Sequence, residues 1–212
     1  MIRQVHLYSP LNVMTEKIWY KLLLEDNCIM EEGEYIQCRV ERMAPNTAWE
    51  GCWALARLPG LGPDNTSFLF KLLHQILPTQ ERVARTKPNT SPECRNPLCE
   101  NTVDDVRHAL IDCQSNDGVG ELLLQCLRGV MPELQVESLI RIELDVATEN
   151  QLPVVFLIAT VLGAVWNLRI KGNRVQQYLV RSQLEAKVNL LRETRHREAA
   201  YKVDELAVTM FQ

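Results

Sequence analysis

Apolar residues recur at helical spacing along most of the chain, and most densely in its last third. Residues 150–170 are apolar at nearly every position, and Pro153 falls in the first turn, where a helix tolerates proline. Residues 174–206 return to an amphipathic pattern with one apolar and one polar face. A short break at Lys171-Gly172-Asn173 joins the two segments, so the pattern predicts a C-terminal antiparallel helical hairpin.

The middle of the chain carries shorter helical patterns separated by turn residues. A wide apolar stripe precedes Pro78, and Thr79 is suited to cap the next helix. The stripe consists of Phe68, Leu69, Leu72, Leu73, Ile76 and Leu77. Residues 87–99 contain three prolines and no periodicity, which predicts a loop. Further helices are predicted from Thr102-x-x-Asp105, which resembles a capping box, and from Asp117-Gly118, while residues 138–146 are ambiguous.

The first part of the chain is the least informative. Thr15 is suited to cap a helix whose shared face holds Ile18, Trp19, Leu22 and Leu23. Residues 35–40 alternate weakly and fit either a short strand or an extended segment. Pro45-Asn46-Thr47 begins a second helix, and its apolar face holds Trp49, Cys52, Trp53 and Ala56.

Together these patterns predict an all-α protein, an irregular helical domain with seven or more helices. We expect three parts: an N-terminal helical segment in residues 1–63, a central region in residues 64–148 and the C-terminal hairpin in residues 149–212. We expect these helices to pack around a core that contains Trp19, Trp49, Trp53, Phe68, Leu72, Phe156 and Trp166. A central sheet of four or more strands would contradict this prediction.

Composition fits a folded chain and narrows the function. The chain is 46% apolar and 24% charged, which supplies enough apolar surface for a core. The formal net charge of -4 excludes a protein that is strongly basic throughout, so any nucleic-acid contact must use a local patch. The longest apolar run, residues 152–166, is shorter than the roughly 20 residues of a membrane span. Because no signal peptide is evident, we expect an intracellular protein, cytoplasmic or nuclear, without a membrane partner.

One cysteine and histidine pattern carries chemistry. Cys94, Cys99, His108 and Cys113 follow the spacing C-x4-C-x8-H-x4-C. Three thiolates and one imidazole form a tetrahedral set for Zn²⁺ that leaves no coordination position open. The alternative is four unrelated residues, some of them buried as small apolar side chains. Seven cysteines in a chain without a secretory signal favour reduced thiols or metal ligands over disulfides.

The same region resembles a known family. Leu73-His74, Leu77-Pro78-Thr79 and Arg82, followed by the four metal-ligand candidates, are similar to the zinc-binding region after the polymerase domain of non-LTR (LINE-type) retrotransposon reverse transcriptases. The similarity covers about residues 67–113. This chain has four residues between its first two cysteines, where the family commonly has two.

The resemblance implies a non-catalytic fragment that lacks the polymerase. A polymerase palm needs several converging carboxylates for two divalent ions, and the one Asp-Asp pair, Asp104-Asp105, is better explained as a charge at a helix start. The resemblance also implies RNA or DNA, and the rest of a reverse transcriptase polyprotein, as partners. No Gly-rich phosphate loop, Gly-x-Ser-x-Gly or His-Glu-x-x-His motif is present, so no catalytic residue is assigned.

Basic residues near the metal-ligand candidates are the candidate nucleic-acid contacts. They are Arg82, Arg85, Lys87, Arg95 and Arg107. Acidic residues are interleaved with them, so a solvated charged face is the alternative. A second basic group, Arg192, Arg195, His196 and Arg197, either contacts phosphate or complements a helix C-terminus.

Three functions therefore compete. The first is a non-catalytic zinc module associated with nucleic acid, and the second is a helical structural or protein-interaction fragment in which zinc only stabilises the fold. The third, a thiol enzyme, needs a low-pKa cysteine beside a base, and no such pair is evident outside the metal-ligand set.

Overall fold

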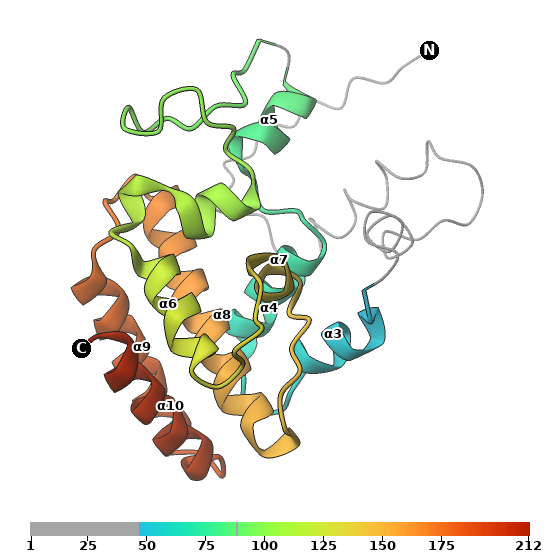
Figure 1. Cartoon of the computed structure of the whole chain (residues 1–212), viewed down its shortest axis with the longest axis vertical. Helices are drawn as coiled ribbons and strands as arrows, with labels where there is room; N and C mark the ends of the chain where they lie inside the picture. Colours follow the sequence, from blue (N-terminus) through green and yellow to red (C-terminus); the bar gives the residue numbers. More distant parts are fainter. Residues whose placement is uncertain (1–46, 88) are drawn as a thin grey trace. The chain divides into compact units, whose positions relative to one another are not determined.

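Helices account for nearly all the regular structure in a computed structural model that describes residues 47–87 and 89–212 (Figure 1). The α-helices are α3 (Trp49–Leu55), α4 (Pro63–Leu73), α5 (Gln80–Thr86), α6 (Val119–Arg128), α7 (Val136–Arg141), α8 (Thr148–Ile170), α9 (Gln177–Arg192) and α10 (Arg197–Met210). Two short helical turns, η2 (His108–Asp112) and η3 (Gln114–Asn116), lie between α5 and α6. Within the described ranges, β pairing is limited to one isolated bridge between Glu93 and Val103. The predicted all-α fold class is confirmed.

Helix α8 is the centre of the described fold. Its length and apolar composition would suffice to cross a membrane, but 83% of its most apolar window is buried inside the protein. Helices α4, α6, α9 and α10 pack against it, with α9 and α10 lying along one another (Figure 1). An apolar helix buried on all sides is the expected core element of a helical protein. The turn η2 contacts α8 as well, and residues 47–212 form one compact unit.

The expected core residues largely lie inside. Trp49, Phe68, Leu72, Phe156 and Trp166 are buried, and Trp53 is half-buried. Trp19, the Thr15 helix and the 35–40 segment lie outside the described residues. Buried apolar side chains of α9 and α10 extend this core, namely Val180, Leu184, Val188, Leu191, Ala200, Val203 and Met210.

The last helical stretch differs from its prediction. Instead of one helix over residues 174–206, α9 ends at Arg192 and α10 begins at Arg197. The Thr194 hydroxyl donates to the Leu191 carbonyl oxygen (2.6 Å) and accepts from the His196 amide (3.1 Å). These side-chain bonds replace helical backbone bonds, so the chain turns and α10 folds back along α9.

Helix α4 also begins and ends at different residues from those predicted. It begins at Pro63, after Gly62 with φ 77°, and it ends at Leu73, well before Pro78. Gln75 adopts a left-handed φ of 52°, and the Ile76 amide reaches back to the Lys71 carbonyl oxygen (3.0 Å). This is the Schellman closure of a helix end. Ile76 and Leu77 stay buried in the irregular segment that leads to α5.

Candidate metal centre

A small hairpin positions the first two cysteines. The Cys94 amide donates to the Thr102 carbonyl oxygen (2.8 Å), and the Asp104 amide donates to the Pro92 carbonyl oxygen (2.9 Å). The bridge between Glu93 and Val103 lies between these bonds. These two backbone hydrogen bonds thus close a loop that has no apolar core of its own.

Asn96 fixes the turn between Cys94 and Cys99. Its side-chain oxygen accepts from the Leu98 amide (3.2 Å), which makes an Asx turn. Its backbone amide lies 3.4 Å from the Cys94 sulfur, and its side-chain amide nitrogen lies 3.5 Å from the Cys99 sulfur. The four-residue gap is therefore closed by one asparagine, and both sulfurs point into the same space.

A π turn positions the other two ligands. The Cys113 amide donates to the His108 carbonyl oxygen (2.8 Å), a bond that spans five residues. In a regular α-helix, residues five apart lie about 140° apart around the axis, on different faces. The wider π turn brings His108 and Cys113 to one side, and such turns are frequent at functional sites.

The start of this helix is capped differently from the prediction. Asp105 Oδ1 accepts from the His108 amide (2.7 Å), as an N-cap side chain does. Thr102, the predicted cap, lies in the loop, where its hydroxyl donates to the Glu100 carbonyl oxygen (3.4 Å). The cap is thus three residues later in the sequence, and it orders the turn that carries His108.

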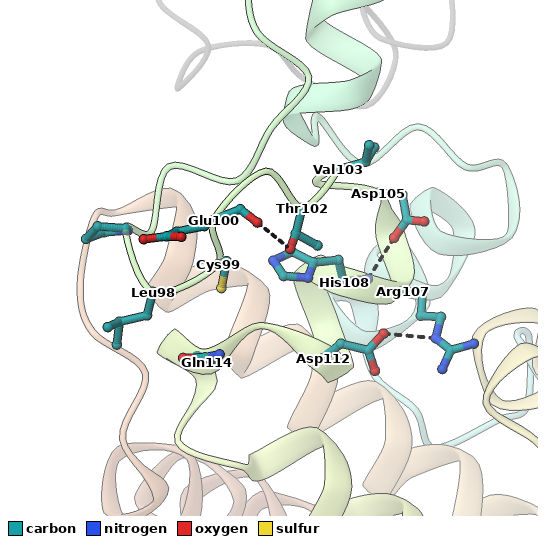
Figure 2. Close-up of a pocket in the computed structure, with 11 residues that line it drawn as sticks. Leu98, Cys99, Glu100, Thr102, Val103, Asp105, Arg107, His108, Asp112 and Gln114 are labelled. Atoms are coloured by element: carbon teal, nitrogen blue, oxygen red, sulfur yellow. Dashed lines mark hydrogen bonds and ion pairs between the residues drawn. The ribbon is translucent and has the colours of Figure 1, made fainter.

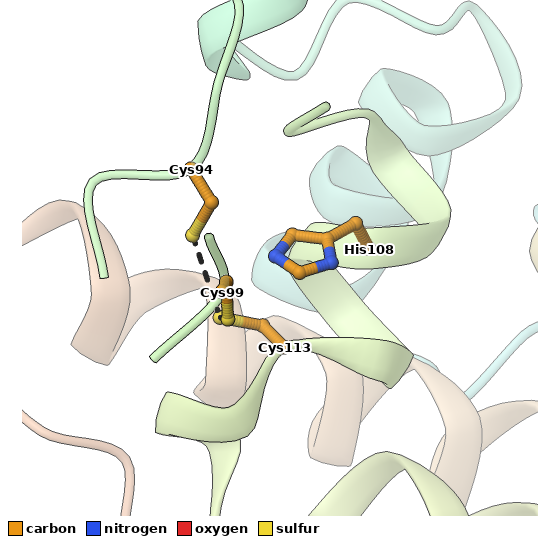
Figure 3. A group of neighbouring side chains, drawn as sticks. All are labelled: Cys94, Cys99, His108 and Cys113. Carbon is orange, nitrogen blue, oxygen red and sulfur yellow. Dashed lines mark hydrogen bonds between the residues drawn. The ribbon is translucent and has the colours of Figure 1, made fainter. Parts of the chain in front are cut away.

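The four candidate ligands converge. The donor atoms of Cys94, Cys99, His108 and Cys113 all lie within 4.8 Å of one another (Figure 3). The Cys113 sulfur is 3.8 Å from the Cys94 sulfur and 3.8 Å from the Cys99 sulfur. A disulfide would bring two sulfurs to about 2.05 Å. Tetrahedral Zn²⁺ with Zn–S bonds of about 2.3 Å separates its sulfurs by about 3.8 Å.

The histidine supplies an independent indication of a ligand. His108 is 6% exposed, and its Nε2 is buried with no hydrogen-bond partner among the described residues. A buried polar nitrogen without a partner costs about 1–3 kcal/mol. Figure 3 shows the imidazole ring beside the three sulfurs, where a shared metal ion would satisfy this nitrogen. The residues therefore fit a zinc ion by donor type, separation and unmet bonding capacity.

Charge and hydrogen bonding favour the thiolate form of one ligand. Burial raises the pKa of the Cys113 thiol, but donors from Ser115 and Arg169 outweigh burial and bring it to about 6. The Ser115 hydroxyl is 3.0 Å from the Cys113 sulfur. Burial raises the pKa of the Cys99 thiol. Cys113 is therefore the ligand best prepared to bind a cation at neutral pH, because the thiolate is the ligating form.

Arg169 and Asp104 belong to this site although sequence analysis missed their role. Arg169 Nη1 donates to the Cys113 sulfur (3.2 Å), and the same guanidinium forms an ion pair with buried Asp104. One signal was available: Arg169 is the single ionisable residue in residues 152–170, the most apolar stretch of the chain. A lone charge in a core helix requires a partner. Asp104 thus serves as the ion-pair partner of Arg169.

The five candidate nucleic-acid contacts divide into two groups. Three have partners within the chain: Arg82 donates to the Gln75 carbonyl oxygen (2.7 Å), Arg85 pairs with Glu81, and Arg107 bonds Asp112 (2.9 Å) and Glu137 (2.7 Å). Lys87 and Arg95 are exposed, and the described part of the chain gives neither of them an ion pair. These two are therefore the candidates with the most freedom to meet an external anion.

A pocket of about 790 Å³ opens beside the ligand set (Figure 2). Cys99 and His108 line it, together with exposed Leu98 and Val103. Its charged lining residues are Glu100, Asp105, Asp112 and Arg107. Arg107 already bonds Asp112. Acidic residues thus dominate the lining, which disfavours phosphate in this pocket.

The thiols of Cys52 and Cys126 and the imidazole of His74 pack against other side chains and lie outside the candidate ligand set. Cys52 and Cys126 are buried, and burial raises the pKa of each thiol, that of Cys52 to about 11. His74 packs against Trp53 and Phe70, with ring centroids 4.8 and 4.1 Å away. Burial and nearby Arg57 lower its pKa to about 4. Cys28 and Cys38 lie outside the described residues.

No family model, curated protein or solved structure matches this chain. The function of the chain must therefore be inferred from the coordination chemistry of the four converging side chains and from the charges around them.

Proposed function

We propose that the chain is a non-catalytic zinc-binding module in which Cys94, Cys99, His108 and Cys113 hold Zn²⁺. The convergence of four donor atoms, one of them the unpartnered Nε2 of His108, carries this proposal. Four protein ligands fill a tetrahedral zinc ion, so the ion supplies a cross-link and no open position for substrate. No residue is assigned a catalytic role.

The cross-link would act where the chain cannot order itself. Residues 89–98 are mostly exposed and contribute little apolar burial. Ordering a residue costs about 1–2 kcal/mol of backbone entropy. Zinc would tie this loop to η2, which packs on α8, and so supply folding free energy that the loop lacks.

Nucleic-acid association is the role that we propose for this module. The resemblance of residues 67–113 to the zinc region of non-LTR reverse transcriptases supports it, as do the exposed cations Lys87 and Arg95 on the zinc loop. RNA or DNA would contact Lys87 and Arg95 and avoid the acidic pocket. Under this hypothesis the chain works inside the cell, with the remainder of a reverse transcriptase as a protein partner.

One observation favours the alternative, a helical fragment in which zinc only stabilises the fold. Arg85 and Arg107, which belong to the predicted basic patch, already pair with acidic residues of this chain. Such pairing lowers the charge available to phosphate. The alternative predicts zinc binding without nucleic-acid binding, so the two hypotheses are separable.

Salt-dependent binding distinguishes them. We expect the zinc-loaded protein to bind a single-stranded RNA and a duplex DNA, each more weakly as salt rises. A Lys87→Ala/Arg95→Ala variant should reduce the slope of log affinity against log salt by about 1.4 to 1.8, from two lost phosphate contacts. The control is Arg181→Ala, which removes an exposed arginine from α9 that pairs with Glu185. No binding by the parent protein, or equal loss in both variants, would favour the alternative.

A further inference from the structure

Arg169 lies in the last turn of α8, and its guanidinium faces the metal-ligand sulfurs. Nη1 donates to the Cys113 sulfur (3.2 Å), and Nη2 lies 3.7 Å from the Cys94 sulfur. The side chain is 18% exposed, so these contacts are largely shielded from water. One cation from the core helix is thus shared between two of the three thiol ligands.

Asp104 also binds the guanidinium of Arg169. Its Oδ1 forms the ion pair with Arg169 Nη2, and its Oδ2 accepts from the Gln80 amide (3.0 Å). Gln80 is the first residue of α5, so the carboxylate also meets the positive end of a helix dipole. Asp104 is only 2% exposed, and both of its oxygens are satisfied. The arginine is therefore held in position by a carboxylate that is not one of the candidate metal ligands.

The charge of the loaded centre explains why a cation is needed there. Three thiolates and one neutral imidazole around Zn²⁺ carry a net charge of -1, from -3 and +2. A buried anion is costly unless a cation or hydrogen-bond donors face it. Arg169 provides both, and its planar fork reaches two sulfurs and a carboxylate together, which the point charge of a lysine cannot do.

We propose that Arg169 is a positioning residue of the zinc centre: it compensates the charge on Cys94 and Cys113 and anchors the metal loop to α8. The inference rests on the proposed zinc binding and adds a residue outside the ligand set. Partners of this kind orient ligands and tune the bound metal. The guanidinium charge stabilises the anionic zinc centre and so strengthens retention of zinc. Its charge-assisted N–H···S bonds withdraw electron density from the sulfurs and so lower the reactivity of the bound thiolates.

Arg169→Met tests this role in the full chain. Zinc affinity, measured by competition with a chromophoric chelator, should fall about ten- to a hundredfold. In the cobalt-loaded protein the thiolate-to-cobalt absorption should move to longer wavelength, because the sulfurs lose two donors. Arg169→Lys keeps the charge without the fork and should give intermediate values. Arg181→Met, the matched control on α9, should change neither readout.

A second variant separates metal tuning from folding. Arg169→Met leaves the buried Asp104 unpaired, so Arg169→Met/Asp104→Asn removes both charges. By circular dichroism, the double variant should have the same helix content as the unsubstituted protein, because no buried charge is left unpaired. It should still bind zinc more weakly than the unsubstituted protein and show the shifted cobalt absorption. Parental affinity and spectrum in the double variant would overturn the proposal, because Arg169 would then serve only to balance Asp104. A parental protein that binds no zinc would instead overturn the proposed function itself.

Discussion

The protonation of the Cys113 thiol links zinc affinity to pH. Donors from Ser115 and Arg169 bring its pKa to about 6 against the effect of burial, so Cys113 is already a thiolate at pH 7. Below about pH 6 its proton must also be displaced when zinc binds. We expect log zinc affinity to fall more steeply with acid below pH 6 than above it. Chelator competition between pH 5 and 8 measures this, and an unchanged slope would contradict it.

Cysteine substitutions separate ligand thiols from core thiols. Cys99→Ser removes one soft ligand and should lower zinc content and loosen residues 89–105. Cys126 is a buried thiol outside the candidate ligand set, and its sulfur contacts the carbonyl oxygen of Leu206 (3.2 Å). Cys126→Ser should therefore leave zinc content unaltered. Elemental analysis of the reduced proteins decides. Zinc that survives the Cys99 change and vanishes with the Cys126 change would refute the ligand assignment.

The group of candidate ligands was predictable and its surroundings were not. Donor type and spacing indicated Cys94, Cys99, His108 and Cys113 as candidate zinc ligands, because Zn²⁺ coordination selects residue types directly, and the structure brings their donor atoms together. The partnership of Arg169 with Asp104 joins residues 65 positions apart, which only the packing of η2 on α8 brings together. Lys87 and Arg107 look alike in the sequence and both are exposed, but Arg107 pairs with Asp112 and Glu137, and this pairing arises from the folded chain.

At the scale of elements, η2 depends on its cap. Asp105→Ala removes the acceptor for the His108 amide and should destabilise the zinc-free protein by about 0.5–2 kcal/mol. Asp112→Ala is the control, since this exposed carboxylate on the same helix has Arg107 as its one ion-pair partner in the described part of the chain, and such pairs are worth about 0–1 kcal/mol. Urea unfolding measures both variants. An equal cost for the two would contradict the capping role.

Helices were predictable, and several of their ends were not. Apolar periodicity located α4 and α8, and Thr79 was correctly placed as the cap of α5, where its hydroxyl accepts from the Arg82 amide (3.4 Å). The break after α9 depends on local bonds of the Thr194 hydroxyl, which residue spacing does not reveal. The π turn at η2 is equally hidden, because its extra residue leaves the apolar pattern of Leu110 and Ile111 intact.

Within the whole described unit, the helices and the loop of residues 89–105 are stabilised by different interactions. Helices α4, α6, α9 and α10 bury apolar side chains against α8, and burial contributes about 25 cal/mol per Å² of apolar surface. The loop of residues 89–105 has backbone pairings and the metal-ligand set, but little burial. We therefore expect the helical core to be independent of bound zinc and the loop to depend on it.

Removal of zinc should accordingly melt one part and spare the other. With a strong chelator under reducing conditions, amide hydrogen exchange in residues 89–105 should accelerate at least tenfold, because the loop loses its cross-link. Buried amides of α8 should stay protected, since their helical partners are unchanged. The η2 segment should respond in between, because it carries His108 and Cys113 yet packs on α8. Exchange that accelerates equally in α8 would show that zinc holds the whole fold, and no acceleration in the loop would show that zinc does not order it.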